Sequence, residues 1–446
     1  MTELEKIAAG AVELALKSGA TGAECTISES AEFEVNVRMR EIESLKEAAS
    51  RGAGIRVLAG RRGGSSYTSD FSKDGIAKMV QAALDLAKIT TEDPHAGLPE
   101  ECGRFEGDLA LYDPAVAAIE TQWKIDQAVA AESSALAADP RVSNSKGASF
   151  ESHLGTRVFA NSLGFVGSYR HSSCGLAAQP VAAQNGSTER DYWYTSARAV
   201  AGLENPELVG RKAAERALRR LNPRKIATQR APVVFEPRTA RALLGELFDA
   251  VSGSSIYRHA SFLTGKLGEK IASEALTVID DATLPGLFGS SPFDDEGVPA
   301  RRTVVIERGV LRNYLLNTYT ARKLGMKTTG NASRGLSGNA GVGPGNFYIE
   351  AGSQTPEQII GGLKAGLYVT ELIGGNANTV TGDYSAGAAG LWIENGELAY
   401  PVSEITIAGN LERMLMDLQQ AGSDLEFRSS IAAPTLLVGE MTISGH

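Results

Sequence analysis

Histidines are the side chains best suited to building a metal site, and this chain has few of them. The five are His95, His153, His171, His259 and His446. No two lie three to five residues apart, so no helix can present a histidine pair to a zinc ion. The pair His171 and Cys174 is closest, but two ligands complete neither a structural nor a catalytic site. The sequence therefore predicts no metal site in this chain.

Motifs for nucleophilic catalysis and for phosphate binding are also missing. No Gly-x-Ser-x-Gly elbow occurs. The glycine-rich stretch 335–345 lacks the strand–loop–helix context of a phosphate cradle, so we expect a mobile or partner-facing surface loop. The acidic run Asp294-Asp295-Glu296 is interpreted as a solvated turn before Gly297, with cation binding as the alternative.

The remaining candidates for acid–base chemistry gather on and after a predicted helix over 237–251. Glu246 and Asp249 lie on that helix, and Arg258 and His259 follow it. Together they form the candidate site of an independent peptidase or hydrolase with an unfamiliar geometry. No spacing among them matches an established catalytic motif.

Composition narrows the class of protein. The chain has 446 residues, of which 43% are hydrophobic and 22% charged, which is typical of a globular protein with a large core. The net charge of −9 argues against a nucleic-acid surface, and the basic run at 219–225 is expected to be a solvated helix end. Three cysteines without paired spacing, no signal peptide and no apolar run of about 18 residues predict a cytoplasmic protein without membrane contact.

Periodicity predicts an α+β protein of two domains. A helix over 3–18 precedes a strand in which Phe33, Val35 and Val37 alternate with polar residues. Residues 1–222 are expected to form an N-terminal domain of helices and antiparallel sheet, and residues 232–446 a strand-rich C-terminal domain. Further elements are expected as hairpins at 54–68, 303–316 and 390–402, and as helices at 73–88, 116–138, 207–221, 356–366 and 409–421.

The C-terminal half resembles a known family. The most specific run is Thr381-Gly382-Asp383-Tyr384-Ser385-Ala386-Gly387-Ala388-Ala389-Gly390, and it continues through Trp392 to Asn410. Earlier segments at 291–297, 319–325 and 328–330 are similar in the same way. On these residues the chain resembles the TldD/PmbA peptidase family, also called modulators of DNA gyrase, over nearly its whole length.

The resemblance also locates a departure from the catalytic branch of that family. In the TldD branch a helix carries His-Glu-x-x-x-His, which binds zinc together with a downstream cysteine. Gly245 and Ala250 occupy the two histidine positions here, and Glu246 occupies that of the general base. No cysteine follows Cys174. The resemblance therefore implies the PmbA/TldE branch, with no catalytic residue, cofactor or metal of its own.

What the resemblance implies is a heterodimer in which a TldD-type subunit supplies zinc. This chain would be the non-catalytic subunit of a metallopeptidase that processes unfolded peptides, with a homodimer as the alternative assembly when the partner is absent. Besides the independent hydrolase, a regulatory binding protein of the gyrase-modulator type remains an alternative. Extended peptides suit exposed sheet edges, because main-chain hydrogen bonds do not depend on side-chain identity.

Overall fold

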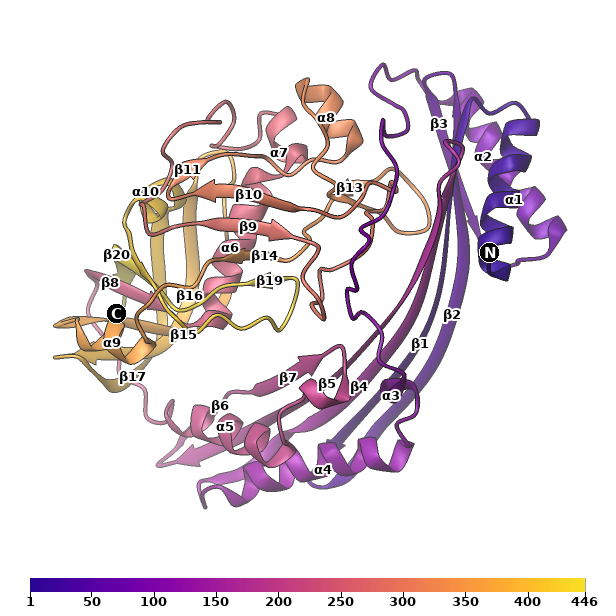
Figure 1. Ribbon diagram of the computed structural model, residues 1–446. Helices are drawn as coiled ribbons and strands as arrows, with labels where there is room; N and C mark the ends of the chain where they lie inside the picture. The colour runs from indigo at the N-terminus through magenta and orange to yellow at the C-terminus, as the bar shows by residue number, and fades with distance from the viewer. Residues whose placement is uncertain (446) are drawn as a thin grey trace.

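A computed structural model describes residues 1–445, and its N-terminal half is built on one long, curved antiparallel sheet (Figure 1). The strand order is β3-β2-β1-β4-β5-β6, and β7 pairs with β5. The strands are β1 Gly22–Arg38, β2 Glu41–Ala59, β3 Arg62–Thr68, β4 Val142–Asn161, β5 Val166–Gln184, β6 Ser187–Arg190 and β7 Trp193–Ala197. The longest of them far exceed an average strand, which allows twist to accumulate into visible curvature.

Alternation along β1 decides which face of this sheet the helices cover. The odd-numbered Cys25 and Ile27 pack against α1 and α2, and the odd-numbered Phe33 and Val35 pack in the core under α4 and α5. Because odd residues share one face of a strand, both helix pairs cover the same face of the sheet. The helices are α1 Glu3–Lys17, α2 Lys73–Ile89, α3 Pro114–Ala117, α4 Thr121–Ala137, the short 3-10 helix Val200–Gly202 and α5 Pro206–Leu218.

The middle of the sheet is left uncovered, and its outer strand has a free edge. Residues 41–51 of β2 are almost all exposed. β3 pairs only with Ala53–Ala59 of β2. Among residues 1–445 no strand pairs with the outer side of residues 41–52, which we call the free β2 edge.

The C-terminal half contains a closed barrel. Pairings run β17-β16-β15-β8-β20 and return from β20 to β17, so these five strands leave no open edge between them. They are β8 Gln229–Phe235, β15 Ala365–Ala377, β16 Asp383–Glu394, β17 Glu397–Asn410 and β20 Leu436–Ser444, with β18 Leu418–Ala421 added on β20. This confirms the predicted α+β class with a strand-rich C-terminal half.

Helix α6, Pro237–Val251, connects the barrel to a second, smaller sheet. Its Leu244 and Leu247 belong to one core with barrel and second-sheet residues, and its Phe248 meets Phe347 of β14 edge to face at 5.4 Å. The second sheet has the order β11-β10-β9-β14-β19, with β9 Val278–Asp281, β10 Arg302–Glu307, β11 Val310–Leu311, β14 Phe347–Ile349 and β19 Ile431–Ala432. The other elements are β12 Ala332–Ser333, β13 Gly341–Val342, α7 Gly253–Tyr257, α8 Thr318–Leu324, α9 Pro356–Gly361 and α10 Leu411–Met416.

A buried charge cluster joins the uncovered face of the curved sheet to the C-terminal half. Glu24 of β1 is 1% exposed and accepts hydrogen bonds from Arg56 Nη1, at 2.9 Å, and from Arg334. Nearby, Arg157 of β4 pairs with Asp295 at 2.7 Å. The even-numbered Glu24 points away from the helices, so this contact lies on the face opposite to theirs.

One loop prediction was wrong. The acidic turn is buried rather than solvated, with Asp294 8% and Glu296 5% exposed. Asp294 accepts hydrogen bonds from the backbone N–H groups of Glu296, Val298 and Ala332, each at 2.9 Å, which compensates its burial. The glycine-rich stretch 335–345 contacts the chain's own sheet, because the backbone of Leu336 lies directly over Gly54 of β2.

Most predicted elements are present, with differences at their ends. The hairpin at 390–402 is confirmed: Asn395 and Gly396 have φ of 51° and 84°, as a two-residue turn of this type requires. The helix expected over 116–138 is divided into α3 and α4, and that expected over 409–421 stops at Met416, because Leu418 pairs in β18. No helix within residues 1–445 has the length and apolar character to cross a membrane.

The contact between Leu336 and β2 predicts that one methyl group added at Gly54 will destabilise the fold. A Cβ at Gly54 would lie 1.5 Å from the carbonyl oxygen of Leu336, so Gly54→Ala must displace the loop. We expect a loss of about 1–3 kcal/mol in unfolding free energy, measured by chemical denaturation. Gly10→Ala is the matched control, because Gly10 lies within α1 and a Cβ there meets nothing within 4 Å. It should gain roughly 0.5–1 kcal/mol. A Gly54→Ala variant as stable as wild type would contradict the observed packing.

The Glu24 cluster predicts that the losses of stability caused by changes at Glu24 and Arg334 are coupled. Arg334→Ala leaves the buried Glu24 carboxylate with one partner, and removing a partner from a buried ion pair costs about 3–5 kcal/mol. Adding Glu24→Gln should recover part of that loss, since the side chain buried at position 24 is then neutral and no longer needs Arg334. Lys17→Ala, which breaks the exposed pair with Glu13, should leave the denaturation midpoint unchanged. Strict additivity of the Glu24 and Arg334 effects would argue against the pairing.

Candidate functional site

The two helix positions at which the sequence resemblance implies zinc ligands carry glycine and alanine. On α6, Gly245 faces open space, since a Cβ built there meets nothing within 4 Å, and Ala250 is fully buried. Neither side chain has a donor atom, so these residues do not fit a zinc ion. Within residues 1–445 no three His, Cys, Asp or Glu side chains converge as a ligand set, and His446 lies outside the described residues.

Glu246 has a structural contact in place of a metal. Its Oε2 accepts a hydrogen bond of 3.1 Å from the backbone N–H of Ala377, the last residue of β15. Burial raises the pKa of the Glu246 carboxyl, and the neighbouring Asp249 raises it further. Burial also raises the pKa of Asp249. The Glu246 carboxylate therefore ties α6 to the end of a barrel strand.

The four residues considered for an independent hydrolase are divided between two places. Glu246 and Asp249 lie one turn apart on α6, whereas Arg258 and His259 follow α7. Arg258 Nε donates to the hydroxyl of Tyr257 at 2.8 Å, and His259 has a positive φ of 54°. Among the described residues, no hydrogen bond or ion pair joins either carboxylate to Arg258 or His259.

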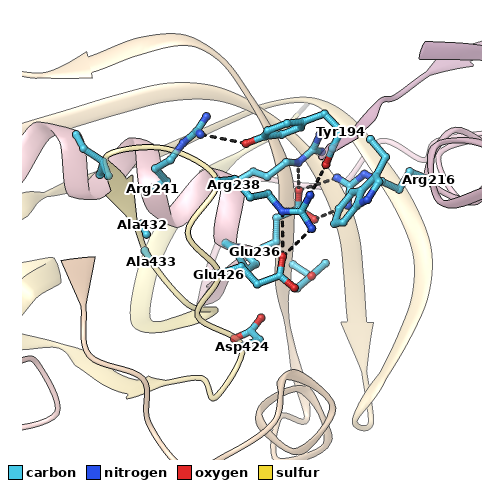
Figure 2. A pocket seen from close by; sticks show the side chains of 14 residues that line it. Tyr194, Arg216, Glu236, Arg238, Arg241, Asp424, Glu426, Ala432 and Ala433 are labelled. Carbon is cyan, nitrogen blue, oxygen red and sulfur yellow. Dashed lines mark hydrogen bonds and ion pairs between the residues drawn. The ribbon is translucent and has the colours of Figure 1, made fainter. Parts of the chain in front are cut away.

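A buried ion network lies at the N-terminal end of α6, and sequence reasoning missed it (Figure 2). Arg216 of α5 donates to both oxygens of Glu236, at 3.0 and 2.6 Å, and contacts Asp191 at 3.2 Å. Arg238 of α6 donates to Glu236 at 2.9 Å and to Asp191 at 3.1 Å. Arg219, expected on a solvated helix end, also pairs with Glu236, at 3.3 Å. The network binds the two halves together. The only feature of the sequence that could have predicted it is the spacing of the arginines on α5.

A cavity of about 230 Å³ opens beside this network. Arg428 donates to the carbonyl oxygen of Tyr194 and pairs with Glu204 and Glu426, at 2.6 and 2.7 Å. Arg241 donates to the Tyr194 hydroxyl at 3.1 Å, as Figure 2 shows. Nearly every charge around the cavity is satisfied within the chain, and no nucleophile lies beside a base. These contacts hold the segments around the cavity together.

Comparison with known proteins gives matches to one protein family along the chain. Models of the PmbA/TldA metallopeptidase family match as domain 1 over residues 23–87, central domain over 114–221 and C-terminal domain over 228–445. The chain is 42% identical to metalloprotease PmbA of Escherichia coli O157:H7, over 99% of this chain and 96% of that protein. It is 38% identical to a PmbA homolog of Haemophilus influenzae, over 100% and 96%.

Solved structures agree with this placement. A candidate modulator of DNA gyrase from Bacteroides thetaiotaomicron matches with a TM-score of 0.92 and 30% identity, covering 100% of both chains. TldE from Thermococcus kodakarensis shares the fold, with a TM-score of 0.88 at 22% identity over 98% and 99% of the two chains. The family resemblance is thus confirmed along the chain, and the protein belongs to the PmbA/TldD metallopeptidase family.

Proposed function

We propose that this chain is the metal-less subunit of a two-subunit metallopeptidase, and that a TldD-type partner supplies the catalytic zinc. The observation that carries the proposal is the pair Gly245 and Ala250 on α6, where ligand side chains would be required. The remaining carboxylate, Glu246, is engaged with the backbone of Ala377. Relatives are named metalloproteases, so the reaction class is peptide hydrolysis by the complex.

The ligand we propose is an extended, unfolded peptide. Peptides of any sequence can add to an open strand through main-chain hydrogen bonds. The barrel strands are closed on one another, so the free β2 edge at 41–52 is the place that supports this mode best. Beside it, a cavity of about 490 Å³ is floored by small residues of β1, β2 and β4, namely Ser30, Ala31, Ala49, Ser50 and Gly155.

The relation between the two halves supports a role in enclosure. The C-terminal half lies on the concave side of the curved sheet (Figure 1). The Arg216–Glu236 network and the Glu24–Arg334 pair fix the two halves to each other at separate places. A rigid wall of this kind would restrict entry to unfolded chains and position them for the zinc of the partner. A homodimer is the alternative assembly when the partner is absent.

The competing function is an independent hydrolase, which the metalloprotease names of the relatives and the raised pKa of Glu246 favour. A regulatory binding protein is the third candidate, because a solved relative is described as a modulator of DNA gyrase. The three proposals differ in what the pure chain does. Only the independent hydrolase cleaves peptides alone, only the metal-less subunit needs a peptidase partner for cleavage, and the regulatory protein takes no part in cleavage.

The first prediction concerns zinc and activity. Purified alone, the chain should hold zinc well below one ion per molecule by elemental analysis and should not cleave an unfolded peptide library. Activity should appear on mixing with a TldD-type subunit and disappear when a chelator removes zinc from that subunit. Glu246→Ala in this chain should leave the rate of the mixture nearly unchanged. A loss of about 10²–10⁴-fold, typical of a missing general base, would favour the independent hydrolase.

The second prediction concerns the free β2 edge. Neighbouring residues of an antiparallel strand direct their N–H groups to opposite edges, so Lys46→Pro and Glu47→Pro form a matched pair. One variant removes a hydrogen bond to β1 and should lower the melting temperature. The other removes an outward N–H and should melt like wild type while weakening peptide cleavage by the mixture. Undiminished cleavage in the variant that melts normally would rule out peptide addition at this edge.

A further inference from the structure

A polar cavity of about 500 Å³ lies where the curved sheet meets the C-terminal half, apart from the network of Figure 2. Its size is within the range of ligand-binding clefts. Its walls come from the β2–β3 end of the sheet, the connection at 90–97, the segments around α7 and α8, the acidic turn at Glu296 and the loop residues 339–341. The lining residues used below are Arg56, Arg61, Arg258, Asp93, Glu296, Tyr257 and Tyr319.

Two arginines on the walls of this cavity have most of their hydrogen-bonding capacity free. Arg61 Nη1 donates to the carbonyl oxygen of Pro94 at 3.2 Å, and Arg258 Nε donates to the Tyr257 hydroxyl at 2.8 Å. Within residues 1–445 neither guanidinium has a carboxylate oxygen within 4.0 Å. A guanidinium has five N–H donors, so each can still bind a planar anion. The third arginine, Arg56, is engaged with Glu24.

Acidic groups in the same cavity restrict the anion. Glu296 is 5% exposed and accepts a hydrogen bond of 2.9 Å from the backbone N–H of Thr318 through Oε2. Asp93 accepts from the Tyr319 hydroxyl at 2.8 Å. A doubly charged phosphate group would meet repulsion from these carboxylates, whereas a single carboxylate followed by peptide N–H groups would find acceptors for those groups.

We propose that this cavity binds the free C-terminal carboxylate of a peptide, held by Arg61 and Arg258. The inference rests on the proposed function in taking an extended peptide as the ligand, and it adds which end of that peptide is recognised. Arg56 follows the last residue of the free β2 edge, Gly52, by four residues, or about 13 Å along the strand. Because β3 pairs with β2 from Ala53 onward, a peptide on that edge would leave it after Gly52 for its terminal residues to enter the cavity.

The test measures binding of two labelled peptides to the full chain by fluorescence anisotropy. Both are N-terminally fluorescein-labelled Ala-Ser-Ala-Gly-Ala, one with a free carboxylate and one with a terminal amide. The free acid should bind roughly tenfold more tightly, because charge-assisted hydrogen bonds to arginine are lost in the amide. The difference should shrink as salt is raised. Arg61→Gln with Arg258→Gln should abolish it, whereas Arg211→Gln should preserve it, because Arg211 is an exposed arginine of α5 that forms no ion pair within residues 1–445.

Several outcomes would overturn the proposal. They are equal binding of acid and amide by the wild-type chain, an unchanged preference in the double variant, and competition by inorganic phosphate stronger than by acetate. The comparison of the acid with the amide uses wild-type protein, so it tests the proposal even when the double variant fails to fold. Failure here leaves peptidase activity of the mixed subunits intact, whereas failure of the proposed function removes that activity and leaves carboxylate preference measurable.

Discussion

The cost of removing charge from water governs how the two halves of this protein meet. Asp191, Glu236 and Glu24 are each less than 5% exposed, and a carboxylate so buried is tolerated only with partners of opposite charge. Each has at least one such partner in the other half: Arg238 of α6 for Asp191, Arg216 of α5 for Glu236, and Arg334 for Glu24. Separation of the halves would expose unpaired charges on both sides, so the chain behaves as one body around its concave face.

Local chemistry explains which parts of this fold could be predicted from sequence. The Asn395-Gly396 turn requires a left-handed backbone, and these two residues adopt it at low cost. The hairpin could therefore be predicted from the sequence alone. The strand at Phe33, Val35 and Val37 was equally clear, because one of its faces is buried under helices. Burial of Asp294 and Glu296 was not visible, since it depends on backbone donors as distant as Ala332 and Thr318.

The candidate site likewise has features that could be predicted from sequence and features that could not. That Gly245 and Ala250 lack donor atoms follows from residue type, and no structure was needed to state it. The contact of Glu246 with Ala377 spans 131 residues, and the convergence of Arg61 with Arg258 on one cavity spans the two halves of the chain. Single-sequence patterns report neighbours along the chain, so sites assembled by tertiary packing could not be read from them.

The uncovered side of β2 has a consequence for how such a protein is produced. An open strand whose exposed residues include Ile42 and Leu45 is a template on which like chains can stack. Lys46, Glu47 and Arg51 place charges along it, which opposes indiscriminate stacking but does not abolish it. A surplus of this polypeptide would therefore be prone to aggregation wherever that strand stays uncapped.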